Sequence, residues 1–406
     1  MPFVEKISKG LTKQDLMLIL LLKISLLLVF LKSLFAWFLW ELNPYIVAAI
    51  SIFFSILFCI ARPSYFPLKK EIFISVLLLV LVEFYCVRGS NINGYFGTLL
   101  TTIPIIFVLL LKDTIKIDLL FFLTSAIALI LFVSLCAWIL FLAGVQLPYS
   151  VVNFNDGQYW YNNYFFFLYN LNPSEIIPRF SGIFLEPGHL GVITSFLLFA
   201  NHFALKRKEV LVLLVVTIFT FSLAAYLLLA ISISVFLLMK SKKPFFYFAL
   251  WLSFILIGYY FFVTLNHGDN IVNNLIIERL QVVDGDLAGN NRFSSSMDSY
   301  FEGFLKSDNL YTGISNSKYE SLDLGPNAGY KVFFLQNGIL GTSLLFLFYL
   351  SLVFSNKSKE ALFFLFVYVL AFFQRSYALW ECELLIFITA VSLFKTMDGK
   401  KKYGSN

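Results

Sequence analysis

The chain has 406 residues, of which 59% are hydrophobic and only 13% are charged, and its mean hydropathy is +0.83. Soluble domains use about 45 to 50% apolar residues, so this composition excludes an ordinary soluble protein and predicts a polytopic membrane protein. The net charge of +6 needs no nucleic-acid partner, because basic residues anchored near anionic lipid explain it.

Continuous apolar runs predict about twelve transmembrane helices, since a chain crossing the hydrocarbon core must satisfy its backbone groups internally. No cleavage site follows the first run, so it is interpreted as a retained span. We therefore expect an all-α, polytopic helical membrane protein, with residues 1–406 forming a single integral membrane domain. The expected spans lie near 16–39, 44–61, 72–87, 95–111, 119–145, 189–205, 210–221, 223–239, 244–263, 330–354, 361–373 and 384–396.

Lys and Arg collect in alternate loops between these spans, as the positive-inside rule requires. This pattern places both termini in the cytoplasm and leaves two long polar segments, 146–188 and 264–329, on the outer side. The basic groups are Lys6, Lys9 and Lys13; Arg62, Lys69 and Lys70; Lys112 and Lys116; Lys206, Arg207 and Lys208; Lys240, Lys242 and Lys243; Lys357 and Lys359; and Lys395 with Lys400, Lys401 and Lys402.

The first long outward loop contains the aromatic run GQYWYNNYFFFLYN. Long loops in compact proteins are usually functional or disordered. Aromatic side chains favour the membrane interface, so one interpretation is packing on the membrane surface. The same aromatic and amide groups could stack on sugar rings and hydrogen-bond to them, and the two interpretations are compatible.

The stretch RFSGIFLEPGHL, residues 179–190, places polar groups immediately before an apolar span. Arg179 offers five donors in a fixed fork, which suits a phosphate or a pyrophosphate. Pro187 restricts Glu186 to extended backbone, so the carboxylate should project from a defined turn. His189 is either a second candidate base or a polar residue at the mouth of the span. A structural ion pair between Arg179 and Glu186 is the alternative interpretation.

The second long loop contains NNRFSSSMDSYFEGF, in which Arg292 is either a ligand-binding group or a solvated loop arginine. Two outward arginines together could stabilise a departing pyrophosphate. Asp284 and Asp286, in VVDGDLAGNN, match the paired aspartates of many metal-dependent glycosyltransferases, but a solvated turn explains them equally well. The four cysteines have no metal-ligand or redox spacing. We therefore predict no metal and no cofactor.

These residues resemble a known family. RFSGIFLEPGHLG is similar to the R-x-x-G-x-F-x-E-P signature of the Wzy-type O-antigen polymerases, integral membrane proteins that polymerise lipid-linked oligosaccharide repeat units. TFSLAAYLLLAIS resembles the family's T-x-S-R-G-A segment, with Leu223 where Arg is common. YTGIS carries the short glycine motif. NAGYKVFFLQNGILG resembles H-N-x-Y-L-x-x-L-x-x-x-G, with Asn327 in place of His and with Tyr330 and Gly338 matching.

The resemblance implies a GT-C-like, metal-independent inverting glycosyltransferase on the outer face of the bacterial cytoplasmic (inner) membrane, with two long periplasmic loops. A growing glycan would leave undecaprenyl pyrophosphate and join a hydroxyl of a second lipid-linked unit. Arg179 and Arg292 would neutralise the pyrophosphate, and Glu186 would act as base or orient Arg179. Arg88 and Arg375, on short outward turns, could complete a basic rim. His189, Asn327 and Tyr330 are further candidate substrate contacts.

The partners implied are the undecaprenyl-pyrophosphate-linked donor and acceptor, membrane lipid, a chain-length regulator and a flippase. An O-antigen ligase or another lipid-linked glycosyltransferase is one alternative. Ligases of this architecture rely on a histidine in the second long loop, where this chain has only His267, far from Asn327. A flippase of lipid-linked glycans is the other alternative, although the sequence has no internal repeat of the kind common in transporters.

Overall fold

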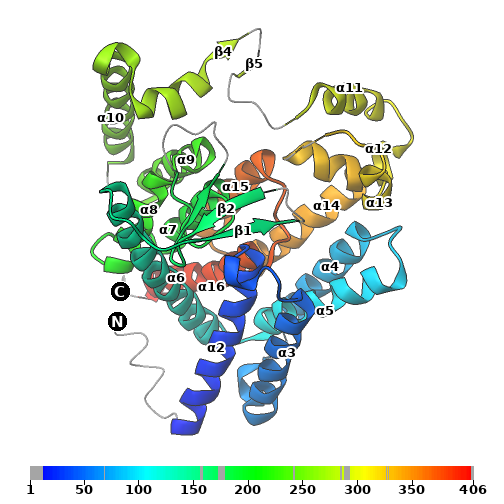
Figure 1. The fold of residues 1–406 in the computed structure, drawn as a ribbon. Coiled ribbons are helices and arrows are strands. Elements are labelled where there is room, and N and C mark those ends of the chain that lie inside the picture. The colour runs from blue at the N-terminus through cyan, green and yellow to red at the C-terminus, as the bar shows by residue number, and fades with distance from the viewer. Residues whose placement is uncertain are drawn as a thin grey trace. The chain divides into compact units, whose positions relative to one another are not determined.

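The computed structural model describes residues 12–67, 69–155, 159–171, 179–240, 243–283, 286–287, 293–325, 327 and 329–403. The chain forms two compact units, and Figure 1 labels their helices and strands. Unit 1 comprises Met1–Ser33, Glu41–Leu123 and Arg292–Asn406, and unit 2 comprises Leu34–Trp40 and Thr124–Asn291. The expectation of one integral membrane domain stays a prediction.

A helix lies at each of the twelve predicted spans, so the helical fold class is confirmed. Among the described residues, seven helices are long and apolar enough to cross a membrane: α2, α3, α5, α6, α9, α10 and α14. Crossing by the other five stays a prediction. The twelve helices are α2 (Lys13–Ser33), α3 (Pro44–Ala61), α4 (Lys70–Cys86), α5 (Ile92–Leu110), α6 (Asp113–Leu142), α7 (Pro187–Ala200), α8 (Lys208–Phe219), α9 (Leu223–Lys240), α10 (Pro244–Thr264), α14 (Tyr330–Asn356), α15 (Lys359–Gln374) and α16 (Glu381–Tyr403).

Local sequence explains where several helices begin. The Asn43 side chain accepts from the N–H of Tyr45 at 2.9 Å, and Pro44 follows as the first residue of α3. The Asn91 side chain likewise accepts from the N–H of Gly94 at 3.0 Å and starts α5. Such caps satisfy backbone donors that have no partner inside the helix.

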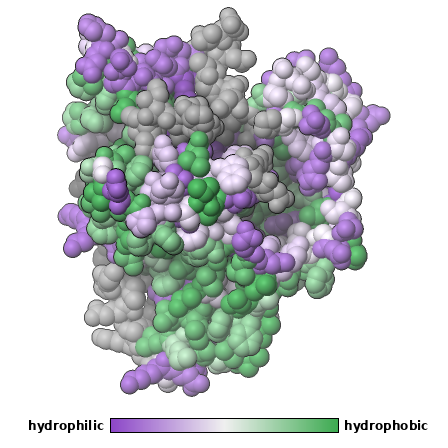
Figure 2. Space-filling view, viewed as in Figure 1, coloured by the Kyte–Doolittle hydropathy of each residue, from purple (hydrophilic) through white to green (hydrophobic). Residues whose placement is uncertain are grey.

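In unit 1, α2 packs against α3 and α16, and α4 packs against α14. Lys23, a charged group inside the first predicted span, donates to the Asp118 carboxylate at 3.0 Å. Charged groups within spans are usually paired in this way. Apolar side chains cover the outer surface of α2 and α3 in Figure 2, as lipid-facing helices require.

The first long outward loop contains a small sheet, which the sequence did not predict. Strands β1 (Ser150–Phe154), β2 (Tyr159–Asn163) and β3 (Leu168–Asn170) form an antiparallel sheet in the order β1-β2-β3. Tyr161 and Leu168 on its inner face pack with Leu185, beside Trp37 and Trp40. The predicted first span also runs too far, because α2 ends at Ser33 and the segment after it joins unit 2.

In unit 2, α7 packs against both α8 and α9, and α10 packs against α9. Every residue of α7 after Pro187 is buried, whereas α10 has no buried residue. A helix that is apolar on all sides and still exposed is suited to lipid contact.

The described residues of the second long loop also form helices and strands. It contains α11 (Ser295–Phe304), α12 (Asn309–Thr312), α13 (Asn316–Glu320), and a two-stranded ribbon of β4 (Val282–Val283) and β5 (Asp286–Leu287). In unit 1, Met297, Phe301 and Phe304 of α11 form an apolar cluster with Ile314 and Leu335.

Candidate functional site

The segment that carries the family resemblance lies in the interior of unit 2. The N–H of Phe180 donates to the carbonyl of Phe219 at 3.0 Å, and Phe184 pairs with Ala36 as an isolated β-bridge. Gly182 has a φ of +56°, a conformation that favours glycine, and its carbonyl accepts from the N–H of Leu168 at 2.8 Å. The backbone of this motif is therefore held from three sides.

Arg179 is partly buried at the start of this segment. Its Nε donates to the carbonyl oxygen of Thr220 at 3.1 Å. This contact joins the Arg of the first motif to the Thr of the T-x-S-R-G-A-like segment. It also fixes one edge of the guanidinium group, and a fixed donor fork binds a phosphate with less loss of side-chain freedom.

Glu186 precedes α7 with φ −133° and ψ 138°, so the predicted extended conformation is confirmed. One Oε of its carboxylate lies 3.4 Å from Nε2 of His189, one helical turn further on. The Glu186 side chain is 36% exposed, whereas His189 is 5% exposed. Glu186 is thus the carboxylate of the motif that solvent reaches, and the buried His189 ring lies beside it.

The segments RFSGIFLEPGHLG and TFSLAAYLLLAIS also approach each other closely at Gly191. A Cβ at this position would lie 2.5 Å from Cβ of Ala225 and 3.1 Å from Oγ1 of Thr220. The hydroxyl of Ser195 donates to the Gly191 carbonyl at 2.7 Å and lies 3.4 Å from the carbonyl of Ala225. The close approach of α7 to α9 therefore requires glycine at residue 191.

Arg88 lies in unit 1 and is bound to the protein backbone. Its guanidinium group donates to the carbonyls of Tyr85 at 3.0 Å and Gln336 at 2.5 Å, and also to Thr312. It reaches the side chain of Asn337 at 3.2 Å as well. Helix α14 bends at Gly338, and Arg88 stabilises this bend through its contacts with Gln336 and Asn337.

The bend itself is formed by two glycines. Gly338 interrupts α14 with a φ of +60° and a ψ of −165°, and a Cβ there would lie 2.5 Å from the backbone N of Gly313. A Cβ on Gly313, which has a φ of +75°, would lie 2.4 Å from the carbonyl oxygen of Gln336. The N–H groups of Ile314 and Ser315 donate to the carbonyls that the break frees. The glycine motif YTGIS and the segment LQNGILG therefore form one junction.

The other sequence-predicted residues of unit 1 are also placed. Asn327 accepts from the N–H of Ser294 at 2.8 Å and donates to the carbonyls of Leu324 and Gly325, both at 2.9 Å. The ring of Tyr330 packs edge-on against Phe293, Phe301 and Phe373. Both contacts order the second loop.

Arg375 ends α15, and its Cζ lies 5.8 Å from the ring centre of Tyr377. Arg292 and Asp284 lie outside the described residues. Arg179, Glu186 and His189 belong to unit 2, whereas Arg88, Arg375, Asn327 and Tyr330 belong to unit 1. Within unit 2, the structure brings Glu186 and His189 into contact and, separately, ties Arg179 to Thr220.

No three His, Cys, Asp or Glu side chains gather into a possible metal site among the residues that the structure describes. The expectation that the chemistry needs no metal or other cofactor stays a prediction.

Comparisons of the chain with protein-family models, with curated proteins and with solved structures find no match. The resemblance to O-antigen polymerases therefore rests on the motif residues of the sequence alone and stays a prediction.

Proposed function

We propose that the protein is a membrane glycosyltransferase that polymerises undecaprenyl-pyrophosphate-linked repeat units into an O-antigen or capsule-type polysaccharide. The observations that carry the proposal are the contact of Arg179 with Thr220 and the contact of Glu186 with His189 in the same segment. The first contact joins two segments that resemble family motifs, because Arg179 and Thr220 lie 41 residues apart in the chain. A cation can stabilise a departing pyrophosphate, and a carboxylate or an imidazole can act as the general base.

In the proposed mechanism, Arg179 binds the donor pyrophosphate and stabilises the negative charge that develops as the glycosidic C–O bond breaks. Arg292 is proposed as the second cation. Glu186 takes the proton of the acceptor hydroxyl as its oxygen attacks the anomeric carbon from the opposite face, so that configuration inverts. His189 keeps the Glu186 carboxylate oriented. The products are undecaprenyl pyrophosphate and a glycan longer by the donor chain.

The predicted cytoplasmic membrane location agrees with this reaction, because the long outward loops would face lipid-linked substrates after their transfer across the membrane. The seven membrane-length apolar helices make the protein a membrane protein. Its orientation and its bacterial inner-membrane location belong to the proposal.

The break in α14 favours a second candidate, a flippase of lipid-linked glycans, because broken helices often line transport sites. The carbonyls freed at this break, however, accept from Arg88, Ile314 and Ser315. A break satisfied within the protein fits a structural junction better than an open binding site.

Deletion of the gene from its source organism, followed by analysis of surface and lipid-linked glycans, separates the candidates. The proposal predicts that surface glycans with one repeat unit replace long chains and that re-expression restores the long chains. Long polymer accumulating on the lipid carrier would instead indicate a ligase. Loss of surface glycan with single units retained on the inner leaflet would indicate a flippase, and unchanged glycan length would contradict all three.

A further inference from the structure

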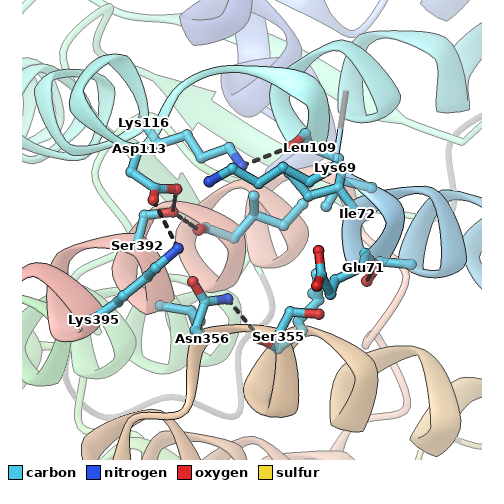
Figure 3. Close-up of a pocket in the computed structure, with 14 residues that line it drawn as sticks. Lys69, Glu71, Ile72, Leu109, Asp113, Lys116, Ser355, Asn356, Ser392 and Lys395 are labelled. Carbon is cyan, nitrogen blue, oxygen red and sulfur yellow. Dashed lines mark hydrogen bonds and ion pairs between the residues drawn. The ribbon is translucent and has the colours of Figure 1, made fainter. Parts of the chain in front are cut away.

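A pocket in unit 1 lies where the ends of five helices meet (Figure 3). It encloses about 500 Å³, part of which is open to solvent. The first turns of α4 and α6, the last turns of α5 and α14, and the later turns of α16 line it. The charge pattern of the sequence predicts the cytoplasmic side for all five of these helix ends.

Lys116 places a buried positive charge in this pocket. The residue is 5% exposed, and its Nζ donates to the carbonyl oxygen of Leu109 at 2.7 Å. An ammonium group has three N–H donors. Within the described ranges, no second acceptor lies within hydrogen-bond distance of Nζ. A buried cation is strongly disfavoured unless opposite charge and further hydrogen bonds compensate it.

The nearest carboxylate, that of Asp113, is already shared. It accepts from Nζ of Lys395 at 3.0 Å and from the hydroxyl of Ser392 at 3.4 Å. Figure 3 shows Asp113 between the Lys116 and Lys395 side chains. Lys69 and Glu71 also line the pocket. The pocket is therefore lined by three ammonium groups and two carboxylates, which leaves one positive charge for a ligand to neutralise. The ammonium groups are those of Lys69, Lys116 and Lys395, and the carboxylates are those of Asp113 and Glu71.

We propose that this pocket binds the phosphate group of an anionic glycerophospholipid. A phosphodiester carries one negative charge and presents several acceptor oxygens, which matches the uncompensated charge and the free donors of Lys116. Ser392 and Asn356 supply polar groups for a headgroup, and Ile72, Leu352 and Val391 supply an apolar wall. A basic pocket between helix ends at the cytoplasmic membrane surface is a common setting for lipid headgroups.

Binding to the purified full-length protein tests this proposal. Native mass spectrometry in detergent would measure the affinity for phosphatidylglycerol, for phosphatidylcholine and for inorganic phosphate. Lys69→Gln removes a charge from the pocket, and Lys70→Gln removes a neighbouring exposed charge that does not line it. We expect Lys69→Gln to weaken phosphatidylglycerol binding about fivefold and Lys70→Gln to leave it unchanged.

If Lys69→Gln and Lys70→Gln lowered the affinity for phosphatidylglycerol equally, the proposed binding site would be wrong, because general surface charge would then explain the attraction. Equal binding of phosphatidylcholine would overturn the requirement for an anionic lipid. Inorganic phosphate displacing the lipid at the same concentration would reassign the site to a free anion. Lys116→Met should lose the preference for phosphatidylglycerol, and a folded Lys116→Met protein that keeps it would also contradict the proposal.

Discussion

Nε of Arg179 donates to the carbonyl oxygen of Thr220 at 3.1 Å, which ties the residue before a buried turn to the junction of α8 and α9. The backbone beside it is joined as well, because the N–H of Phe180 donates to Phe219. A guanidinium group held at Nε keeps its planar fork in a fixed orientation. This contact is the structural basis of the proposed pyrophosphate site.

The α7–α9 contact predicts that Gly191→Ala destabilises unit 2. The new Cβ would lie 2.5 Å from Cβ of Ala225, and neither atom can move without its helix. Overpacking of this kind costs about 1 to 3 kcal/mol. Thermal unfolding of the detergent-solubilised protein measures the effect, with Gly258→Ala as control, because a Cβ there has nothing within 4 Å. An unchanged melting temperature for Gly191→Ala would refute the close packing.

The bend in α14 predicts that Gly338→Ala and Gly313→Ala each destabilise unit 1. Both positions have positive φ, and each new Cβ would collide with the backbone of the other segment. The loss of unfolding free energy in the double variant should be smaller than the sum of the losses in the two single variants, because both substitutions disrupt one junction. Gly303→Ala is the control, since Gly303 lies exposed in α11 with open space around it, and alanine there should be neutral or stabilising. Additive losses would indicate two separate sites.

The contacts of Arg88 predict that Arg88→Lys lowers stability although it keeps the charge. Arg88 donates to four acceptors, whereas a lysine ammonium has three N–H donors and lacks the planar guanidinium fork, so at least one acceptor should lose its partner, which costs about 1 to 3 kcal/mol of stability. Thermal unfolding again provides the measurement, with Arg279→Lys in the second long loop as the matched control. If Arg88→Lys unfolds like wild type but shortens the glycans, Arg88 contacts substrate instead.

The aromatic packing of Tyr330 predicts that its ring matters more than its hydroxyl. Tyr330→Phe keeps the contacts with Phe293, Phe301 and Phe373 and should leave protein level and glycan length unchanged. Tyr330→Ala removes a large, partly buried side chain and should reduce stability by about 1 to 3 kcal/mol. Loss of glycan polymerisation by a stable Tyr330→Phe protein would show that the hydroxyl binds substrate.

The Glu186–His189 contact predicts distinct effects of two substitutions on glycan length. Glu186→Gln keeps the shape but removes the basic oxygen, so polymerisation should fall by 100-fold or more, as general-base catalysis contributes on the order of 10² to 10⁴. His189→Gln keeps a hydrogen-bonding group beside Glu186, so polymerisation should fall less than in Glu186→Gln. Quantified glycan length at equal membrane levels tests the order. A larger loss for His189→Gln would make His189 the base.

Apolar runs predict the helices at the twelve expected spans, because crossing a membrane requires long continuous hydrophobic sequence, but they do not predict α11, α12 and α13 of the second long loop. The extended backbone of Glu186 could also be predicted, since a following proline acts locally. The β-sheet of the first long loop could not, because its strands are stabilised by distant residues such as Trp37 and Leu185. The apolar-run pattern places Lys116 in a loop, whereas α6 begins at Asp113 and buries it. Three partners of Arg88, namely Thr312, Gln336 and Asn337, lie more than 220 residues away, so only the fold identifies them.

The most direct test of the central claim is glycan length in a deletion strain that re-expresses Arg179→Ala or Arg179→Lys, with membrane levels measured in parallel. Arg279→Ala serves as the control. The account predicts that both Arg179 variants, present at wild-type levels, leave glycans of one repeat unit, whereas Arg279→Ala restores long chains. Long chains from an Arg179→Ala protein at normal levels would contradict the account and make RFSGIFLEPGHL a structural turn.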